Sequence, residues 1–156
     1  MKINVVNIFE KTISEAELHI ADGIIKEINV TGPENPALHY ALPGFTDAHV
    51  HIESSMLTPA QFARLAVVHG TVSTVSDPHE IGNVLGMEGV EFMINDGKRV
   101  PFKFCFGAPS CVPATVFETA GAVIDADQVG QLLANDDIGY LAEVMNFQAS
   151  SMKIRI

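Results

Sequence analysis

The 156-residue sequence has no tryptophan, only two cysteines and only nine basic residues. Cys105 and Cys111 are too few for a disulfide framework and lack a CxxC spacing, so we expect both to be reduced thiols. Nineteen acidic residues give a formal net charge of −10, and the basic residues form no cluster. This charge argues against nucleic acid or an anionic membrane as a partner.

Long apolar runs are also missing, since none reaches the roughly 18 residues that a membrane span needs. The first residues, MKINVVNIFEKT, carry Glu10 where a signal peptide has an apolar stretch. We therefore expect a cytoplasmic protein.

Hydrophobic residues nevertheless make up 47% of the chain and charged residues 18%, which is typical of a globular protein with a core. The length is short of the about 250 residues of a complete (β/α)8 barrel.

Residues 1–42 predict part of a small antiparallel β domain, similar to a β-sandwich, followed by a linker. Three short apolar runs, INVVNIF, AELHI and IIKEINV, fit strands. Ala-Asp-Gly between the second and third runs indicates a hairpin turn. Residues 31–42 are rich in Pro, Gly and Asn and fit the linker.

From residue 43 the pattern changes to alternating strands and helices. We expect strands at 43–51, 71–78, 101–108 and 138–145, and helices at 59–70, 85–97 and 125–136. Thr58 and Pro59 indicate the start of the first helix. This alternation predicts an α/β fold with a parallel sheet and right-handed crossovers.

Polar side chains follow all four expected strands. His49 and His51 are two residues apart, so on a strand they project side by side, in one row with Asp47. The other polar residues at strand ends are Asp77, His79, Glu80, Ser110, Cys111, Glu143 and Asn146. Because the carboxyl ends of parallel strands meet at one rim, we expect these side chains to gather there as a functional site.

Each of these motifs also has a plainer interpretation. An HxH pair alone is more often two ordinary histidines than a pair of metal ligands. The DPHE segment also fits the first turn of a helix capped by Asp77, and Glu143 also fits a rim residue in solvent. A buried Glu143, in contrast, would need a cation or hydrogen bonds to offset its desolvation. His19, His39 and His69 lie in the β unit, the linker and a helix end, where we expect structural or surface roles.

Four segments together resemble the adenine deaminases of the amidohydrolase superfamily: PGFTDAHVHIESSMLTP, HGTVSTVSDPHEIGNVLG, PSCVPATVFETAG and LAEVMNF. The HxH pair alone indicates only the superfamily, whereas ESSMLTP, DPHEIGNVLG and PSCVPAT single out adenine deaminase. The resemblance implies that residues 43–147 are the first half of an amidohydrolase (β/α)8 TIM-type barrel, so that the barrel is incomplete, with about four strands. It also implies hydrolysis of adenine to hypoxanthine and ammonia, and a homo-oligomer or self-association.

The resemblance further implies a binuclear metal site in the complete enzyme. His49 and His51 would ligate one divalent metal, manganese or iron with zinc as a possibility, and Glu143 would bridge two metals. Asp77, His79 and Glu80 resemble the family's active-site loop. Together with Glu143 they are the candidate catalytic residues, with roles in substrate binding or proton transfer.

Residues 148–156 depart from the family pattern. Gln148 stands where the family has a proline, and QASSMKIRI resembles nothing in the family. The family pattern continues with a second pair of histidine ligands, an aspartate and four more strands, so we expect a truncated chain that is inactive alone. Two alternatives stay open: a non-catalytic fragment that binds metal or a subunit, and another cyclic amidohydrolase, such as a dihydroorotase.

Overall fold

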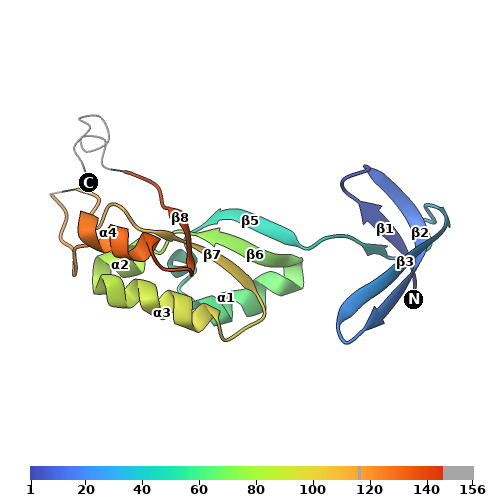
Figure 1. The fold of residues 1–156 in the computed structure, drawn as a ribbon, viewed down its shortest axis with the longest axis horizontal. Helices are drawn as coiled ribbons and strands as arrows, with labels where there is room; N and C mark the ends of the chain where they lie inside the picture. The colour runs from blue at the N-terminus through green and yellow to red at the C-terminus, as the bar shows by residue number, and fades with distance from the viewer. Residues whose placement is uncertain (116, 146–156) are drawn as a thin grey trace. The chain divides into compact units, whose positions relative to one another are not determined.

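A computed structural model describes residues 1–115 and 117–145, and the chain divides into two compact units at residues 44 and 45. The first unit is all β and the second is mixed α/β (Figure 1). No helix in the described part of the chain is long and apolar enough to cross a membrane. The predicted tail at 148–156 lies outside the described residues.

The first unit is a four-stranded sheet in the order β3-β2-β1-β4. Strands β1 (Lys2–Asn7), β2 (Thr12–Ala21) and β3 (Ile24–Pro33) pair antiparallel, as their apolar runs predicted. The predicted turn between β2 and β3 contains Asp22 and Gly23, both with positive φ. The conformation is that of a tight hairpin turn.

Strand β4 (Tyr40–Ala41) lies inside the segment that the sequence predicted as a linker. It pairs parallel with β1. The fully buried side chain of Asn4 donates from Nδ2 to the carbonyl oxygens of Asn35 (2.8 Å) and Leu38 (3.3 Å). Two paired residues have no periodicity to recognise, so only these long-range hydrogen bonds reveal the strand.

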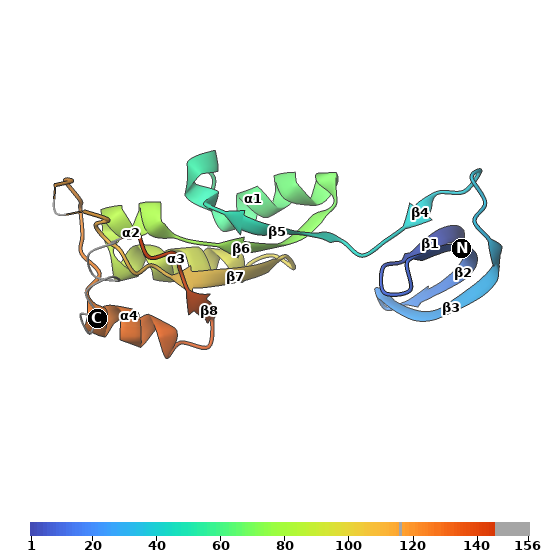
Figure 2. The same ribbon diagram turned by 90° about the horizontal axis from the view of Figure 1, so that it is seen from above.

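The second unit contains a parallel sheet in the order β5-β6-β7-β8. Its strands are β5 (Phe45–Val50), β6 (Thr71–Ser76), β7 (Lys103–Ala108) and β8 (Ile138–Leu141). The connecting helices are α1 (Pro59–Ala66), α2 (His79–Leu85), α3 (Met87–Gly97) and α4 (Ala126–Leu133), with 3₁₀ turns η1 (Ile52–Ser55) and η2 (Val67–His69) (Figure 2). The mixed α/β fold with a parallel sheet is therefore confirmed.

One short helix, α2, was not predicted as a separate element. It ends at Gly86, which has φ +61° and ψ −138°, a conformation that glycine adopts more readily than other residues. Helix α3 starts directly after this break. The helix predicted at 85–97 covers Gly86 and α3, whereas residues 79–84 of α2 lie before its start.

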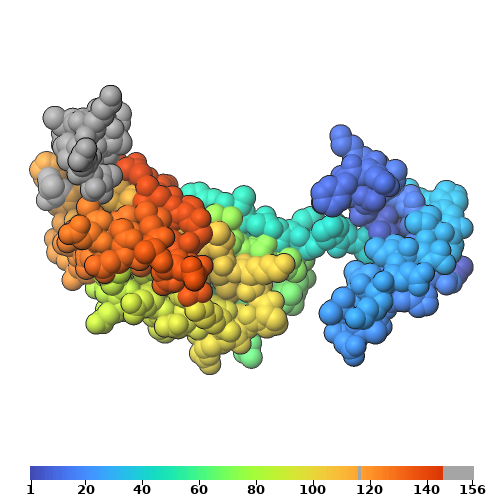
Figure 3. Space-filling model, in the orientation of Figure 1, coloured from blue at the N-terminus to red at the C-terminus, as the bar shows by residue number. Residues whose placement is uncertain are grey.

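The main core lies between the sheet and its helices. Phe106 and Ala108 of β7 pack with Val90 and Ile94 of α3. Val129 of α4 and Ile138 of β8 join the same cluster, and in the space-filling view α4 and β8 form a continuous surface with α3 (Figure 3). Since side chains alternate along a strand, Gly107 faces the other side of the sheet.

The start of α1 is capped by a residue of α3. Thr58 precedes the helix but makes no side-chain capping bond to its backbone. Instead the buried Asp96 carboxylate accepts a hydrogen bond from the Ala60 N–H at 2.8 Å and from Arg99 Nη1 at 2.9 Å. Burial alone would raise the pKa of Asp96, but these bonds and one from Thr58 hold it below its usual value.

Candidate metal centre

Four side chains converge at the carboxyl ends of the parallel strands. His49 belongs to β5 and His51 follows that strand, Asp77 follows β6, and Glu143 lies just beyond β8. One ligand atom from each of the four residues lies within 4.8 Å of every other. The structure therefore brings together residues that are up to 94 positions apart (143 − 49).

The ring nitrogens of the two histidines face the two carboxylates. His49 Nε2 lies 3.6 Å from Asp77 Oδ2, and His51 Nε2 lies 3.6 Å from Glu143 Oε1. Both separations are longer than an ordinary hydrogen bond. Two carboxylates and two imidazoles around one small space are a donor set that suits a divalent cation such as zinc, manganese or iron. The residues present thus fit a metal.

A second set of contacts orients His51. Its Nδ1 lies 2.9 Å from the backbone oxygen of Asp77 and 3.2 Å from Glu80 Oε2. A carbonyl oxygen can only accept, so these contacts assign the proton to Nδ1 and leave the Nε2 lone pair directed at the cluster. Glu80 is itself held by Ser54, whose Oγ donates to Oε1 at 2.6 Å. Such an arrangement fixes the tautomer of a histidine ligand.

Asp77 is buried, and both of its carboxylate oxygens have partners. The Tyr140 hydroxyl donates to Oδ1, and the Glu143 N–H lies 3.5 Å from Oδ2. Burial and the bond to the carboxylate raise the pKa of Tyr140 above its usual range. His79 and Glu80 do form the first turn of α2, as the alternative interpretation predicted, but the described residues include no side-chain cap for this helix, and the Asp77 carboxylate is directed at the cluster instead.

His79 is the first residue of α2 and is buried beside the cluster. Its ring centroid lies 5.9 Å from that of His51. Neither ring nitrogen has a hydrogen-bond partner among the described residues. Burial lowers the pKa of His79, although the carboxylates of Asp77 and Glu143 act in the opposite direction. A neutral imidazole with an unused donor and an unused acceptor is equipped to bind a polar group.

Sequence reasoning missed two residues at this site. Glu53 lies in the turn after the HxH pair, and its Oε1 accepts a hydrogen bond from the Ile81 N–H at 3.3 Å. Burial raises the pKa of Glu53. Tyr140 belongs to the apolar segment GYLAEVM, where nothing in the sequence separates it from a core residue. Only the register of β8 against β7 could have identified it.

The remaining expected residues are distributed as follows. Ser110 Oγ donates to the backbone oxygen of Glu143 at 3.0 Å, and Cys111 is buried. Asn146 lies outside the described residues. His19, His39 and His69 are exposed and are not part of the cluster.

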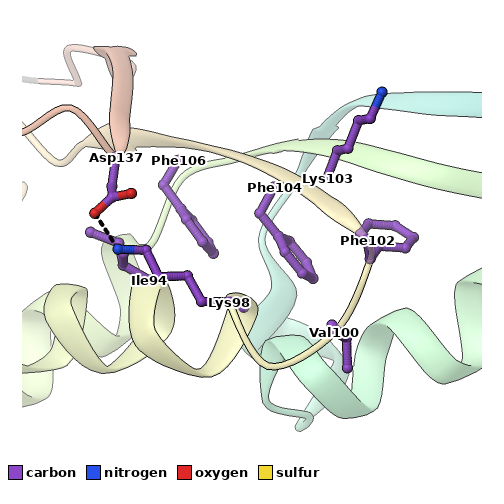
Figure 4. A pocket seen from close by; sticks show the side chains of 9 residues that line it. Ile94, Lys98, Val100, Phe102, Lys103, Phe104, Phe106 and Asp137 are labelled. Carbon is purple, nitrogen blue, oxygen red and sulfur yellow. Dashed lines mark hydrogen bonds and ion pairs between the residues drawn. The ribbon is translucent and has the colours of Figure 1, made fainter.

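A pocket of about 300 Å³ lies elsewhere, around the start of β7 and the end of α3 (Figure 4). Phe102, Phe104 and Phe106 line it, and an ion pair joins Lys98 to Asp137 beside it. The pocket shares no residue with the four-residue cluster. The four clustered side chains therefore give no reason to assign the metal site to this pocket.

A parallel α/β sheet with histidines and carboxylates at its carboxyl edge is typical of metal-dependent enzymes. The model of the amidohydrolase family matches residues 40–152, and the chain belongs to this family. The chain is 58% identical over 144 residues to an adenine deaminase of Salinibacter ruber. The aligned segment covers 91% of this chain and 26% of the relative. The recognised resemblance is confirmed.

Two further relatives give the same result. An adenine deaminase of Sulfurovum is 55% identical over 147 residues, covering 94% of this chain and 27% of the relative. An adenine deaminase of Borreliella burgdorferi is 53% identical over 153 residues, covering 95% and 27%. The chain thus spans about a quarter of the length of the curated relatives it matches.

Proposed function

We propose that this chain carries the HxH part of an adenine deaminase active site, which hydrolyses adenine to hypoxanthine and ammonia. One observation carries the proposal. The four clustered side chains all lie within residues 40–152, the segment that matches the amidohydrolase family, and the relatives over this segment are adenine deaminases. Adenine would be the small-molecule partner.

His49, His51 and Glu143 would hold a divalent metal, manganese or iron with zinc as a third candidate. The complete enzyme would hold two such metals, and Glu143 would be the carboxylate that they share. A divalent metal bound by these residues would lower the pKa of water and so supply a nucleophile at neutral pH. The contacts of His51 Nδ1 to Asp77 and Glu80 hold the ring so that its Nε2 faces the position of the metal.

Asp77, His79 and Glu80 would handle the substrate and its protons. Burial lowers the pKa of His79, which favours the neutral ring, and neither ring nitrogen has a hydrogen-bond partner among the described residues, so the ring can bind a donor or an acceptor on adenine. Glu80 is partly exposed and already touches His51, so it can carry a proton between the site and solvent. Asp77 turns one oxygen to the cluster, where it can accept a proton from water and return it to the departing amine.

The four parallel strands would form the first half of a (β/α)8 barrel. In that arrangement β5 and β8 are the edge strands that receive further strands. Exposed edges beside apolar side chains such as Phe45 and Leu141 favour association with another polypeptide. We therefore expect the isolated chain to self-associate, and we place the protein in the cytoplasm.

The test is ammonia release from adenine by the purified chain with added Mn²⁺. The variants His49→Ala and Glu143→Ala should abolish release, because each removes a proposed ligand. His69→Ala is the matched control, since His69 is an exposed histidine outside the cluster. A chain that binds Mn²⁺ but releases no ammonia would agree with the expectation that this chain is inactive alone, whereas release from a different cyclic amide would favour another amidohydrolase.

A further inference from the structure

Tyr140 crosses one strand to reach Asp77. Tyr140 lies on β8 and Asp77 follows β6, with β7 between them in the sheet. The Tyr140 hydroxyl nevertheless donates a hydrogen bond to Asp77 Oδ1. The ring must therefore pass over β7 on the face of the sheet opposite the helices.

Gly107 makes this path possible. It is the register partner of Tyr140 on β7, so a side chain at position 107 would point to the same face as the tyrosine ring. A Cβ built at Gly107 would lie 2.7 Å from Cε2 and Cζ of Tyr140. Real Cβ atoms essentially never approach other atoms so closely. The space that the missing side chain leaves is the space that the ring occupies.

The contact decides which oxygen of Asp77 faces the metal cluster. With Oδ1 held by Tyr140, Oδ2 is the oxygen that lies 3.6 Å from His49 Nε2 and 3.5 Å from the Glu143 N–H. Asp77 is only 3% exposed, so solvent offers no alternative partner for Oδ1. Without the tyrosine hydroxyl, the buried Oδ1 would lack its donor and the carboxylate would be free to rotate.

We propose that Tyr140 is a positioning residue, which fixes the Asp77 carboxylate so that a single oxygen is presented to the metal centre, and that Gly107 is required to admit its ring. This inference rests on the four-residue cluster, to which Asp77 contributes one possible ligand atom, and not on the identity of the substrate. It assigns to Tyr140 an effect on metal binding that a residue of the apolar core would not have.

The test is the dissociation constant of Mn²⁺, measured by electron paramagnetic resonance on the whole 156-residue chain. Tyr140→Phe should weaken binding about tenfold, the lower end of what the loss of an outer-shell partner costs. Tyr40→Phe is the matched control, because the chain has only two tyrosines and the Tyr40 hydroxyl donates to Glu34 in the first unit. This control should bind Mn²⁺ like the unsubstituted chain.

A double-mutant cycle separates positioning from general damage. If Tyr140 acts through Asp77, Tyr140→Phe should cause no further loss in an Asp77→Asn background. An equal loss in both backgrounds would overturn the proposal, as would unchanged Mn²⁺ affinity in Tyr140→Phe. An unsubstituted chain that binds no Mn²⁺ would overturn the proposed effect of Tyr140 on metal binding. None of these readouts requires turnover, so they stay interpretable whether or not adenine is deaminated.

A second measurement needs neither metal nor a Tyr140 variant. The chain has no tryptophan and two tyrosines, so the tyrosine emission of Tyr40→Phe comes from Tyr140 alone. A hydrogen-bonded carboxylate quenches tyrosine emission, and Asp77→Asn in this background should therefore raise the emission. Unchanged emission would show that the contact is not made and would overturn the proposal.

Discussion

His51 Nδ1 lies 2.9 Å from the backbone oxygen of Asp77, and this contact joins the end of β5 to the end of β6. The oxygen belongs to the main chain, so no side-chain substitution at Asp77 removes it. His51 thus keeps its orientation through one main-chain contact and one side-chain contact, to Glu80. The side-chain contact can therefore be removed by substitution while the main-chain contact remains.

Glu80→Gln should weaken Mn²⁺ binding moderately, by about tenfold, because His51 loses a charged outer-shell partner but keeps the main-chain one. The measurement is Mn²⁺ titration of the chain. Glu88→Gln is the matched control, since Glu88 is an exposed glutamate on α3. Equal affinities in the two variants would contradict the role of Glu80 in orienting His51.

Asp96→Ala should lower the free energy of unfolding by about 1 to 3 kcal/mol, because α1 loses its cap and the Ala60 N–H loses its partner. Thermal unfolding followed by circular dichroism measures the loss. Glu91 is an exposed acidic residue on α3, the helix that also carries Asp96, and Glu91→Ala should change the free energy of unfolding much less. A loss of similar size in both variants would mean that the interhelix cap contributes little.

The stability from Asp96 should depend on pH in one direction. Its pKa is below its usual value in the folded chain, so the contribution is complete above the unfolded pKa of about 3.9 and is lost as the pH falls through the folded pKa. The difference in unfolding free energy between the unsubstituted chain and Asp96→Asn should therefore shrink on acidification below about pH 4. A difference that grew over this interval would contradict the direction of the shift.

Gly107→Ala should destabilise the second unit by about 1 to 3 kcal/mol, because the added methyl group overlaps the Tyr140 ring. Gly130→Ala is the matched substitution. Apart from the backbone of α4 itself, no atom of the described residues lies within 4 Å of a Cβ at Gly130, and alanine there should raise stability by up to about 1 kcal/mol. Opposite signs in urea-induced unfolding would verify the packing of the two glycines.

Asn4→Ala should destabilise the first unit by about 1 to 3 kcal/mol, since the backbone groups of Asn35 and Leu38 lose their buried partner. Hydrogen exchange of the amides around β4 measures the effect locally. Asn29→Ala, at an exposed position on β3, should leave this exchange unchanged. If both variants exchanged alike, β4 would not depend on Asn4.

Much of the fold was predictable from local pattern. The apolar runs predicted the first three strands, and the alternation after residue 43 predicted the parallel strands β5 to β8 with α1, α3 and α4 between them. Strand β4 and helix α2 were not predicted. Strand β4 depends on a buried side chain 31 residues or more away, and α2 ends where the predicted helix at 85–97 begins.

The candidate site shows the same division. The HxH spacing predicted that His49 and His51 lie in one row, and the family motifs proposed Glu143 and the DPHE segment as candidates. Whether Asp77 caps a helix or faces the cluster could not be read from DPHE, since both conformations are compatible with those four residues. The choice depends on Tyr140 and Glu143, which lie 63 and 66 positions further along the chain.

The sequence by itself determined the family, the order of strands and helices, and the side-chain types that are able to bind a metal, because these depend on composition and spacing along the chain. The tertiary structure decided which oxygen of Asp77 faces the cluster, why Gly107 has no side chain, and which residue caps α1. Each of these depends on atoms that only the register of neighbouring strands and the packing of helices bring within a few ångströms of each other.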